Sequence, residues 1–197
     1  MNEIEVEILK KVLEDDEVAF MKIVECFQRP VYNLCFRMLG NKEAAEDAAQ
    51  ETFWKAFQSI RKYNPERSFS TWLLSISAHH CIDQYRKRKF LGVECDDYLA
   101  EIVPDLLPRP ESIFLQKEQQ KQVQDILNGL PDLDRASIIL RYWHECSEEE
   151  IGLILNISKN AVKSRLHRAR KKLAIVWQNR NQYSTQVERR NYLPLGI

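Results

Sequence analysis

The chain has 197 residues, of which 44% are apolar and 29% charged, a composition typical of a globular protein with one domain or two small ones. No apolar run approaches the roughly 20 residues that span a bilayer, and the acidic, amphipathic start does not match a signal peptide, so we expect a cytoplasmic protein without membrane insertion. The net charge of zero conceals a division, because residues 159–197 hold ten basic residues and one acidic residue, which suits a polyanion, whereas residues 1–158 hold 19 basic and 28 acidic residues.

Helical patterns fill the first part of the chain. A helix is predicted over 16–27 and a second over about 31–39, because Pro30 between them lacks the amide hydrogen that a helix interior needs. Gly40 tolerates the positive φ of a helix end. Asn41 can then cap a third helix, since its side chain accepts a hydrogen bond from an amide of the first turn.

The third helix, over about 42–60, gathers alanines and phenylalanines on one broad side and carboxylates elsewhere. The loop RKYNPERSFS follows, in which Asn64-Pro65 is a turn signal. A fourth helix over about 71–89 ends in the basic cluster 86–89. Two interpretations of that cluster stay open: its cations complement the dipole of the helix end, or they bind a phosphate backbone.

The character of the chain changes between the two halves. Residues 90–112 are acidic and contain three prolines, which predicts a linker. Helical patterns return over 113–127, stop at Gly129 and Pro131, and return over about 134–143.

A helix-turn-helix pattern follows over 147–173. Ser147 and Glu150 have the spacing of a capping box, 156–158 has turn composition, and Ser158 can cap a second helix. That helix directs Val162, Leu166, Ala169 and Leu173 inward by its periodicity, and its outer face is polar and basic: Asn160, Lys163, Ser164, His167, Arg168 and Lys171. Such a face suits the major groove of DNA. The alternative is a solvated amphipathic helix with no partner.

No metal site or cofactor is expected. The five cysteines form no CxxC pair, so we interpret most of them as small buried apolar residues. His79-His80-Cys81 contains metal-binding residue types, but neighbours on a helix point in different directions and the usual ligand spacings are missing.

Three segments, in this order and separated by the acidic linker, resemble the bacterial sigma factors of the extracytoplasmic-function (ECF) group of the sigma-70 family: DAAQETFWKAF, FSTWLLSISAHHCIDQYRKRK and EEEIGLILNISKNAVKSRLHRARKKL. The resemblance implies an all-α fold of two small helical domains on a flexible acidic linker. Sigma region 2 would occupy 1–90, the linker 91–112, sigma region 4 with its helix-turn-helix 113–175, and a C-terminal extension 176–197.

The resemblance also implies a function. The protein would not be an enzyme but would bind core RNA polymerase and direct it to promoter DNA, and an anti-sigma factor is the usual further partner of such proteins. By the same resemblance, core polymerase would contact Asp47, Gln50, Glu51 and Phe53. The minus-ten element, as melted single strand, would contact Tyr63, Asn64, Ser68, Phe69, Trp72, Arg86 and Arg88. The minus-thirty-five element would meet the outer face of the second helix of the helix-turn-helix, where Arg168 would donate to guanine.

Three alternatives stay open. Phe69 and Trp72 are also candidates for core packing. Residues 176–197 extend past the usual end of region 4, and we favour an unstructured tail there over a docking helix. A conventional helix-turn-helix regulator that binds a duplex palindrome is the alternative function, although it would not need a second basic, aromatic surface over 61–89.

Overall fold

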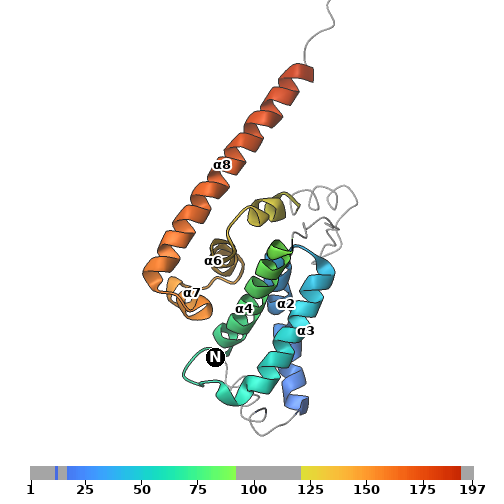
Figure 1. Ribbon diagram of the computed structural model, residues 1–197, viewed down its shortest axis with the longest axis vertical. Helices are drawn as coiled ribbons and strands as arrows, with labels where there is room; N and C mark the ends of the chain where they lie inside the picture. The colour runs from blue at the N-terminus through green and yellow to red at the C-terminus, as the bar shows by residue number, and fades with distance from the viewer. Residues whose placement is uncertain (1–11, 13–16, 92–120, 192–197) are drawn as a thin grey trace, which may run out of the picture.

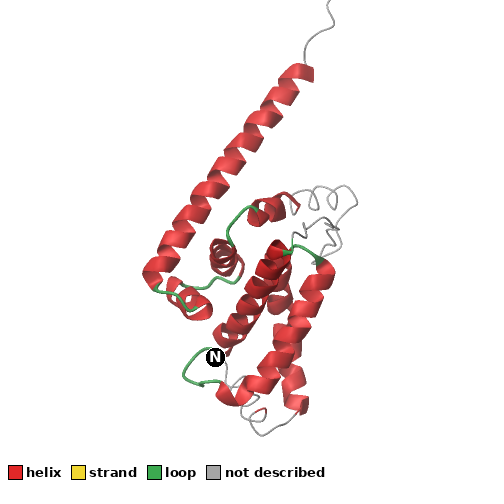
Figure 2. Cartoon of the chain, viewed as in Figure 1, coloured by secondary structure: helices red, strands yellow, loops and turns green. Residues whose placement is uncertain are grey.

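The computed structural model describes Val12, residues 17–91 and residues 121–191, with side chains of the last helix up to Ile175. Helices and connecting turns make up these ranges, and no strand occurs within them (Figures 1 and 2). The predicted all-α class is confirmed. The predicted linker lies outside the described residues except for Leu91. Within the described ranges, no helix is long and apolar enough to cross a membrane.

The first long helix, α2 (Glu17–Leu39), continues through Pro30, so the predicted break at this proline is wrong. A proline inside a helix costs about 3 kcal/mol, because it removes a hydrogen bond and crowds the preceding turn. Val31, Leu34 and Met38, which follow it, are completely buried. Burying one such side chain stabilises the fold by about 1.5 to 3 kcal/mol. Packing of the second half of α2 therefore outweighs the local cost.

The turn after α2 forms as predicted. Gly40 adopts a φ of +72°, and the Oδ1 of Asn41 accepts a hydrogen bond of 2.8 Å from the amide of Ala44. This cap begins α3 (Lys42–Ser59). A short 3-10 helix, η1 (Ile60–Lys62), and an exposed loop then lead into α4 (Phe69–Phe90). Helices α2, α3 and α4 pack against one another.

The second half begins with helical residues 121–128, followed by α6 (Asp132–Trp143), α7 (Glu148–Leu155) and α8 (Lys159–Asn191). The favoured prediction of an unstructured tail is wrong over 176–191, where the backbone of α8 continues as a helix that projects away from the other helices (Figure 1). Residues 192–197 of the extension lie outside the described ranges.

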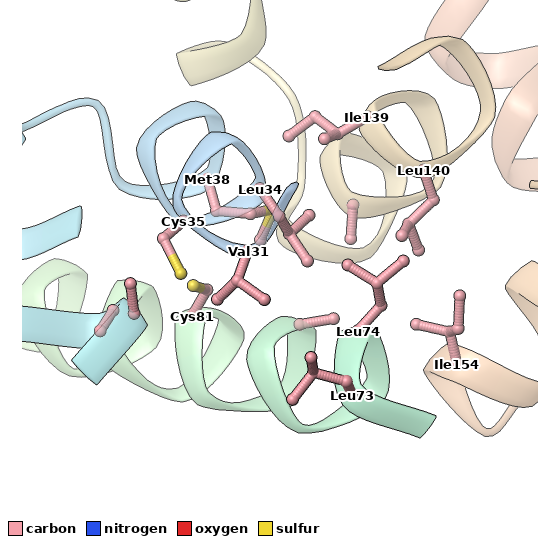
Figure 3. Packing of buried hydrophobic residues seen from close by; sticks show 14 of the residues in the cluster. Val31, Leu34, Cys35, Met38, Leu73, Leu74, Cys81, Ile139, Leu140 and Ile154 are labelled. Carbon is pink, nitrogen blue, oxygen red and sulfur yellow. The ribbon is translucent and has the colours of Figure 1, made fainter. Parts of the chain in front are cut away.

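The two halves share one apolar core. Helix α4 of the first half packs against α6 and α7 of the second, and α2 packs against α6. Figure 3 shows Leu74 of α4 directed toward Leu140 of α6 and Ile154 of α7. Leu140 and Ile154 are completely buried and Leu74 nearly so. The helix-turn-helix therefore packs against α4, the helix that follows the exposed loop.

Candidate nucleic-acid interface

The helix-turn-helix is built by local hydrogen bonds that the sequence predicts. The backbone amide of Ser147 donates to the carboxylate of Glu150 at 2.8 Å, and the amide of Glu150 donates to the Ser147 hydroxyl at 3.2 Å, which completes the capping box. Asn156 ends α7 in the left-handed conformation, with a φ of 52°. The hydroxyl of Ser158 then accepts from the amide of Ala161 at 3.2 Å at the start of α8.

Gly152 allows this turn to close, and sequence reasoning missed it. A Cβ atom at this position would lie 2.9 Å from the carbonyl oxygen of Ile157, and the amide of Ile157 donates to the carbonyl of Gly152 at 3.0 Å. The backbone of α7 and that of the turn before α8 approach too closely here for a side chain. A conserved pattern among relatives would have been needed to find it, because a glycine inside a helix has no signature of its own.

Replacing Gly152 with alanine should therefore open the turn. We expect Gly152→Ala to lower the free energy of unfolding by about 1 to 2 kcal/mol, because the opposing atom belongs to backbone and cannot move aside as a side chain would. Ala161→Gly, at a half-buried position of α8, provides a control for the general cost of exchanging these residues. Urea denaturation followed by circular dichroism measures both. Equal stability of the wild type and Gly152→Ala would contradict the packing argument.

The outer face of α8 is exposed as predicted. Val162, Leu166 and Ala169 are at most 1% exposed, and Leu173 is half-buried. The six predicted contact residues are all exposed: Asn160, Lys163, Ser164, His167, Arg168 and Lys171. The periodicity of α8 therefore sorts its residues correctly into a core side and a solvent side.

Arg168 is bound to a buried carboxylate, whereas Lys163 on the same face lies 3.9 Å from the half-buried carboxylate of Glu148. The Nε and Nη2 of Arg168 donate to the carboxylate of Asp134 at 3.3 and 3.2 Å, and Arg165 donates to the same carboxylate at 3.0 Å. Asp134 of α6 is only 3% exposed. In the structure this edge of Arg168 fastens α8 to α6, so the predicted bidentate donation to guanine requires Arg168 to exchange Asp134 for the base. Sequence reasoning could not see a partner 34 residues away.

The loop before α4 is organised by an aromatic cluster. Tyr63 and Phe69 are buried, with ring centroids 5.3 Å apart, and Trp72 lies 5.3 Å from Tyr63 and 5.4 Å from Phe69. The hydroxyl of Tyr63 donates to the carbonyl of Arg67 at 2.6 Å. The burial of Tyr63 and Phe69 therefore argues against the prediction that they contact a base directly. Core packing, the alternative for Phe69, is what the structure shows.

The remaining residues of this loop face solvent. Asn64 and Ser68 are exposed and Trp72 is half-buried. The Oδ1 of Asn64 accepts from the amide of Glu66 at 3.0 Å, which tightens the turn. At the far end of α4, Arg86 donates to Asp132 at 2.6 Å, and Arg88 is half-buried. The structure thus brings Asn64, Ser68 and Trp72 together at the start of α4 and leaves the two arginines at its other end.

One face of α3 presents the predicted acidic residues. Asp47 and Gln50 are exposed and Glu51 is half-buried, whereas Phe53 is 9% exposed and belongs to the core. This burial argues against the prediction that Phe53 contacts core polymerase. Trp54, which sequence reasoning missed, is 56% exposed. Its exposure is visible only in the structure; the sequence offered only the residue type, since tryptophan is enriched among the residues that anchor protein interfaces.

A groove of about 320 Å³ borders this face between α3 and α4. Asp47, Glu51 and Arg88 line it, together with His80 and a few apolar residues. The Nδ1 of His80 lies 2.8 Å from the Nζ of Lys55. Burial, and secondarily the charge of Lys55, lower the pKa of His80 below its usual value. The neutral imidazole can accept from the lysine, which in turn lies 3.5 Å from Glu51.

The histidines and cysteines do not converge. The Nδ1 of His79 lies 2.8 Å from the carbonyl oxygen of Ser75, and His80 faces Lys55. Cys81 is buried and lies beside Cys35 (Figure 3). Among the described residues, no group of three or more His, Cys, Asp or Glu side chains is placed to hold a metal ion. Cys146 is also buried, and burial raises the pKa of its thiol to about 11.

Comparison with known proteins identifies the family. Sigma-70 region 2 matches residues 23–90 and Sigma-70, region 4 matches residues 120–173. The chain is 39% identical over 173 residues to the ECF RNA polymerase sigma factor SigW of Bacillus subtilis, covering 84% of this chain and 92% of that protein. The chain belongs to the ECF sigma factors of the sigma-70 family.

Two further likenesses agree with this assignment. The sigma factor is 37% identical over 145 residues to the ECF RNA polymerase sigma factor SigE of Mycolicibacterium smegmatis, covering 73% of this chain and 55% of that protein. A solved structure of CnrH in complex with the cytosolic domain of CnrY has a TM-score of 0.68 at 21% identity, and covers 90% of this chain and 99% of that one. The second likeness is one of fold.

Proposed function

We propose that this sigma factor binds core RNA polymerase and directs it to promoters through two separate DNA-reading surfaces. One is the outer face of α8, which would read the minus-thirty-five element as duplex. The other is the loop over 61–68 with the start of α4, which would read the minus-ten element as melted strand. The observation that carries the proposal is the exposed polar and basic face of α8, presented by a capped helix and a tight turn. A helix of this kind fits the major groove.

On α8, Lys163, Ser164 and His167 are the proposed base-reading residues, because they lie in the first turns of the helix, where base edges are reached. Asn160 and Lys171 flank them on the same face. We assign Arg168 a positioning role, because its hydrogen bonds to Asp134 of α6 hold α8 in place.

At the minus-ten surface, Asn64, Ser68 and the exposed part of Trp72 are the proposed contacts. An amide and a hydroxyl can hydrogen-bond to the edge of an extruded base, and an indole can stack on its face. Tyr63 and Phe69, which are buried beneath the loop, would fix its conformation. The basic end of α4 would follow the backbone, with Arg86 and Arg88 as candidates.

For core polymerase, the proposed docking face is Asp47, Gln50, Glu51 and Trp54 of α3. Carboxylates around one exposed indole suit a basic, partly apolar partner, and aromatic anchors of this kind are enriched where proteins bind one another. Polymerase supplies the chemistry of transcription, so we propose no catalytic residue in this chain. We also propose an anti-sigma factor as a further partner, since the family commonly has one.

The conventional helix-turn-helix regulator is not favoured, because the family likeness covers both halves of the chain in order. In-vitro transcription with core RNA polymerase on fragmented genomic DNA distinguishes a sigma factor from a conventional regulator. New transcript starts that share two upstream sequence motifs are expected when the sigma factor is added. No new starts, together with sequence-specific duplex binding by the free protein, would instead establish the regulator.

Lys163 offers a specific test of the α8 surface. We expect Lys163→Ala to reduce transcription from a mapped promoter by about tenfold, because loss of a base or phosphate contact costs about 1 to 3 kcal/mol. Lys121→Ala removes an equal charge from an exposed position of the same half but outside α8. The control should transcribe as the wild type does, and both variants should retain core-polymerase binding. Equal transcription by the two variants would remove Lys163 from the interface.

A further inference from the structure

A single buried carboxylate lies behind the outer face of α8. Asp134 belongs to the first turn of α6 and is 3% exposed. Its Oδ1 accepts from the Nη1 of Arg165 at 3.0 Å and from the Nη2 of Arg168 at 3.2 Å, and its Oδ2 accepts from the Nε of Arg168 at 3.3 Å. A buried charge is costly unless it is paired, and the start of a helix also favours an anion. Asp134 is therefore a built partner of both arginines.

The two arginines differ in how much they depend on this partner. The side chain of Arg165 is 24% exposed and that of Arg168 is 56% exposed. The Nε of Arg165 is buried and has no hydrogen-bond partner among the residues that the structure describes, so Asp134 is the group that compensates this guanidinium. Arg168 borders solvent on the DNA-facing side of α8. Without Asp134, its charge would be free to meet a phosphate.

The lysines at the start of α8 are held more weakly. Lys159 pairs with Glu149, and the Nζ of Lys163 lies 3.9 Å from the carboxylate of Glu148. Both carboxylates belong to α7, and the two lysine side chains are 49% and 56% exposed. Exposed ion pairs of this kind contribute little to stability, so a DNA phosphate can replace these carboxylates. Helix α8 thus presents lysines that DNA can bind and arginines that Asp134 retains.

This difference affects how the helix treats DNA of any sequence. Contacts to phosphates raise the affinity for every duplex alike, whereas contacts to base edges specify the sequence. An arginine that is already paired with a buried carboxylate gains little by exchanging that anion for a phosphate. Retaining Arg165 and Arg168 therefore lowers the affinity for non-specific duplex. The base contacts proposed for Lys163, Ser164 and His167 are left intact.

We propose that Asp134 is a specificity-determining residue of this sigma factor, which competes with DNA phosphates for Arg165 and Arg168 and so raises the preference of α8 for its own promoter element. Asp134 acts through the two arginines and does not itself contact DNA. The effect on promoter preference rests on the function proposed above. The competition with phosphates does not, because it concerns duplex of any sequence.

The test uses the full chain and three variants. Asp134→Asn keeps the size of the side chain and removes its charge. Arg168→Lys keeps the charge at an exposed position, but an ammonium cannot reproduce the paired Nε and Nη2 contact. Glu145→Gln, at an exposed position after α6, removes the same charge as Asp134→Asn and is the matched control. Circular dichroism checks the helical content of each protein.

Two measurements are made. Fluorescence anisotropy follows the binding of the free chain to a labelled mixed-sequence duplex of about 20 base pairs at several salt concentrations, because the dependence of affinity on salt reports the phosphates neutralised. Transcription with core polymerase compares a mapped promoter with the same promoter after its minus-thirty-five element has been scrambled. The ratio of the two transcript yields measures selectivity.

We expect Asp134→Asn to bind the mixed-sequence duplex about fivefold more tightly and to steepen the slope of log affinity against log salt by about 0.9, the value of one added phosphate contact. Its selectivity should fall about fivefold. Arg168→Lys should change the slope and the selectivity in the same directions. Glu145→Gln should leave the slope and the selectivity as they are in the wild type.

The outcomes separate the proposal from its competitors. A slope that stays at the wild-type value in both Asp134→Asn and Arg168→Lys rules out competition with phosphates, and if Asp134→Asn loses helical content, Arg168→Lys decides. Equal changes in Asp134→Asn and Glu145→Gln attribute the effect to net charge. Loss of affinity with unchanged selectivity makes Asp134 a purely structural residue. A wild type that does not distinguish the promoter from its scrambled form contradicts the proposed function, whereas the salt slopes still test the competition.

Discussion

Reversing the charges of Asp47 and Glu51 should weaken the binding of this sigma factor to core RNA polymerase by about a hundredfold, or about 2.7 kcal/mol. The two residues lie one helical turn apart on the same face of α3, with Asp47 exposed and Glu51 half-buried. Replacing both with arginine would place two cations against a basic partner. Like-charge juxtaposition across an interface costs several kcal/mol.

The control is Glu46→Arg, compared with Asp47→Arg alone, because each of these variants changes the net charge by two units. Glu46 is exposed on the same helix, but its side chain points about 100° away from that of Asp47. Copurification with core polymerase and competition against the wild type measure the affinity. Circular dichroism checks that α3 remains folded, since Glu51 also lies 3.5 Å from Lys55. Full affinity in the double variant, or an equal loss in the control, would place the docking face elsewhere.

Trp54 is a further residue of the proposed polymerase-docking face of α3. Its ring is stacked on Phe57 with centroids 6.4 Å apart, so the indole is held in position although it is 56% exposed. The position was not selected from the sequence because Phe53, next to it, is the stronger apolar signal. Adjacent residues on a helix point about 100° apart, so one of the two had to face the core. Only the packing of α3 against α2 and α4 shows that it is Phe53.

Features encoded within a few residues were predicted well from the sequence. The Asn41 cap, the positive φ at Gly40, the capping box at Ser147 and the inward face of α8 each depend on neighbours along the chain. The local chemistry of caps and turns has few solutions. The same locality explains why the fold class and the order of the helices were predictable.

Features that depend on distant partners were not. Pro30 is a strong local signal for a break, yet the buried residues after it keep α2 continuous. Asp134 captures Arg168 across 34 positions, and the aromatic loop turns Tyr63 inward. Arg135 of α6 is another example, since it is 1% exposed between the two halves. Arginine is mostly exposed in proteins, and the neighbours of Arg135 along the chain do not indicate its burial.

A neutral, half-buried histidine should make this protein sensitive to mild acid. His144 follows α6, and burial, reinforced by the nearby charge of Arg37, lowers its pKa from 6.5 to about 4. In the unfolded chain the imidazole titrates near 6.5. Above that pH both states are neutral and the contribution to stability is complete. As the pH falls below 6.5 the unfolded state takes up a proton that the folded state resists, so stability is lost.

The loss attributable to His144 should reach about 2.5 kcal/mol at pH 4.5, since each unit of pKa difference corresponds to about 1.4 kcal/mol. Carboxylates and His80 also titrate in this range, so the measurement compares the wild type with His144→Gln, which lacks the proton-binding ring. Urea denaturation of both proteins at pH 7.5, 6.5, 5.5 and 4.5 gives the difference in unfolding free energy at each pH. The wild type should lose stability relative to the variant by about this amount between pH 7.5 and 4.5, with most of the change below pH 6.5. Parallel pH profiles of the two proteins would mean that His144 is solvated or paired in the folded state and that its burial does not control acid sensitivity.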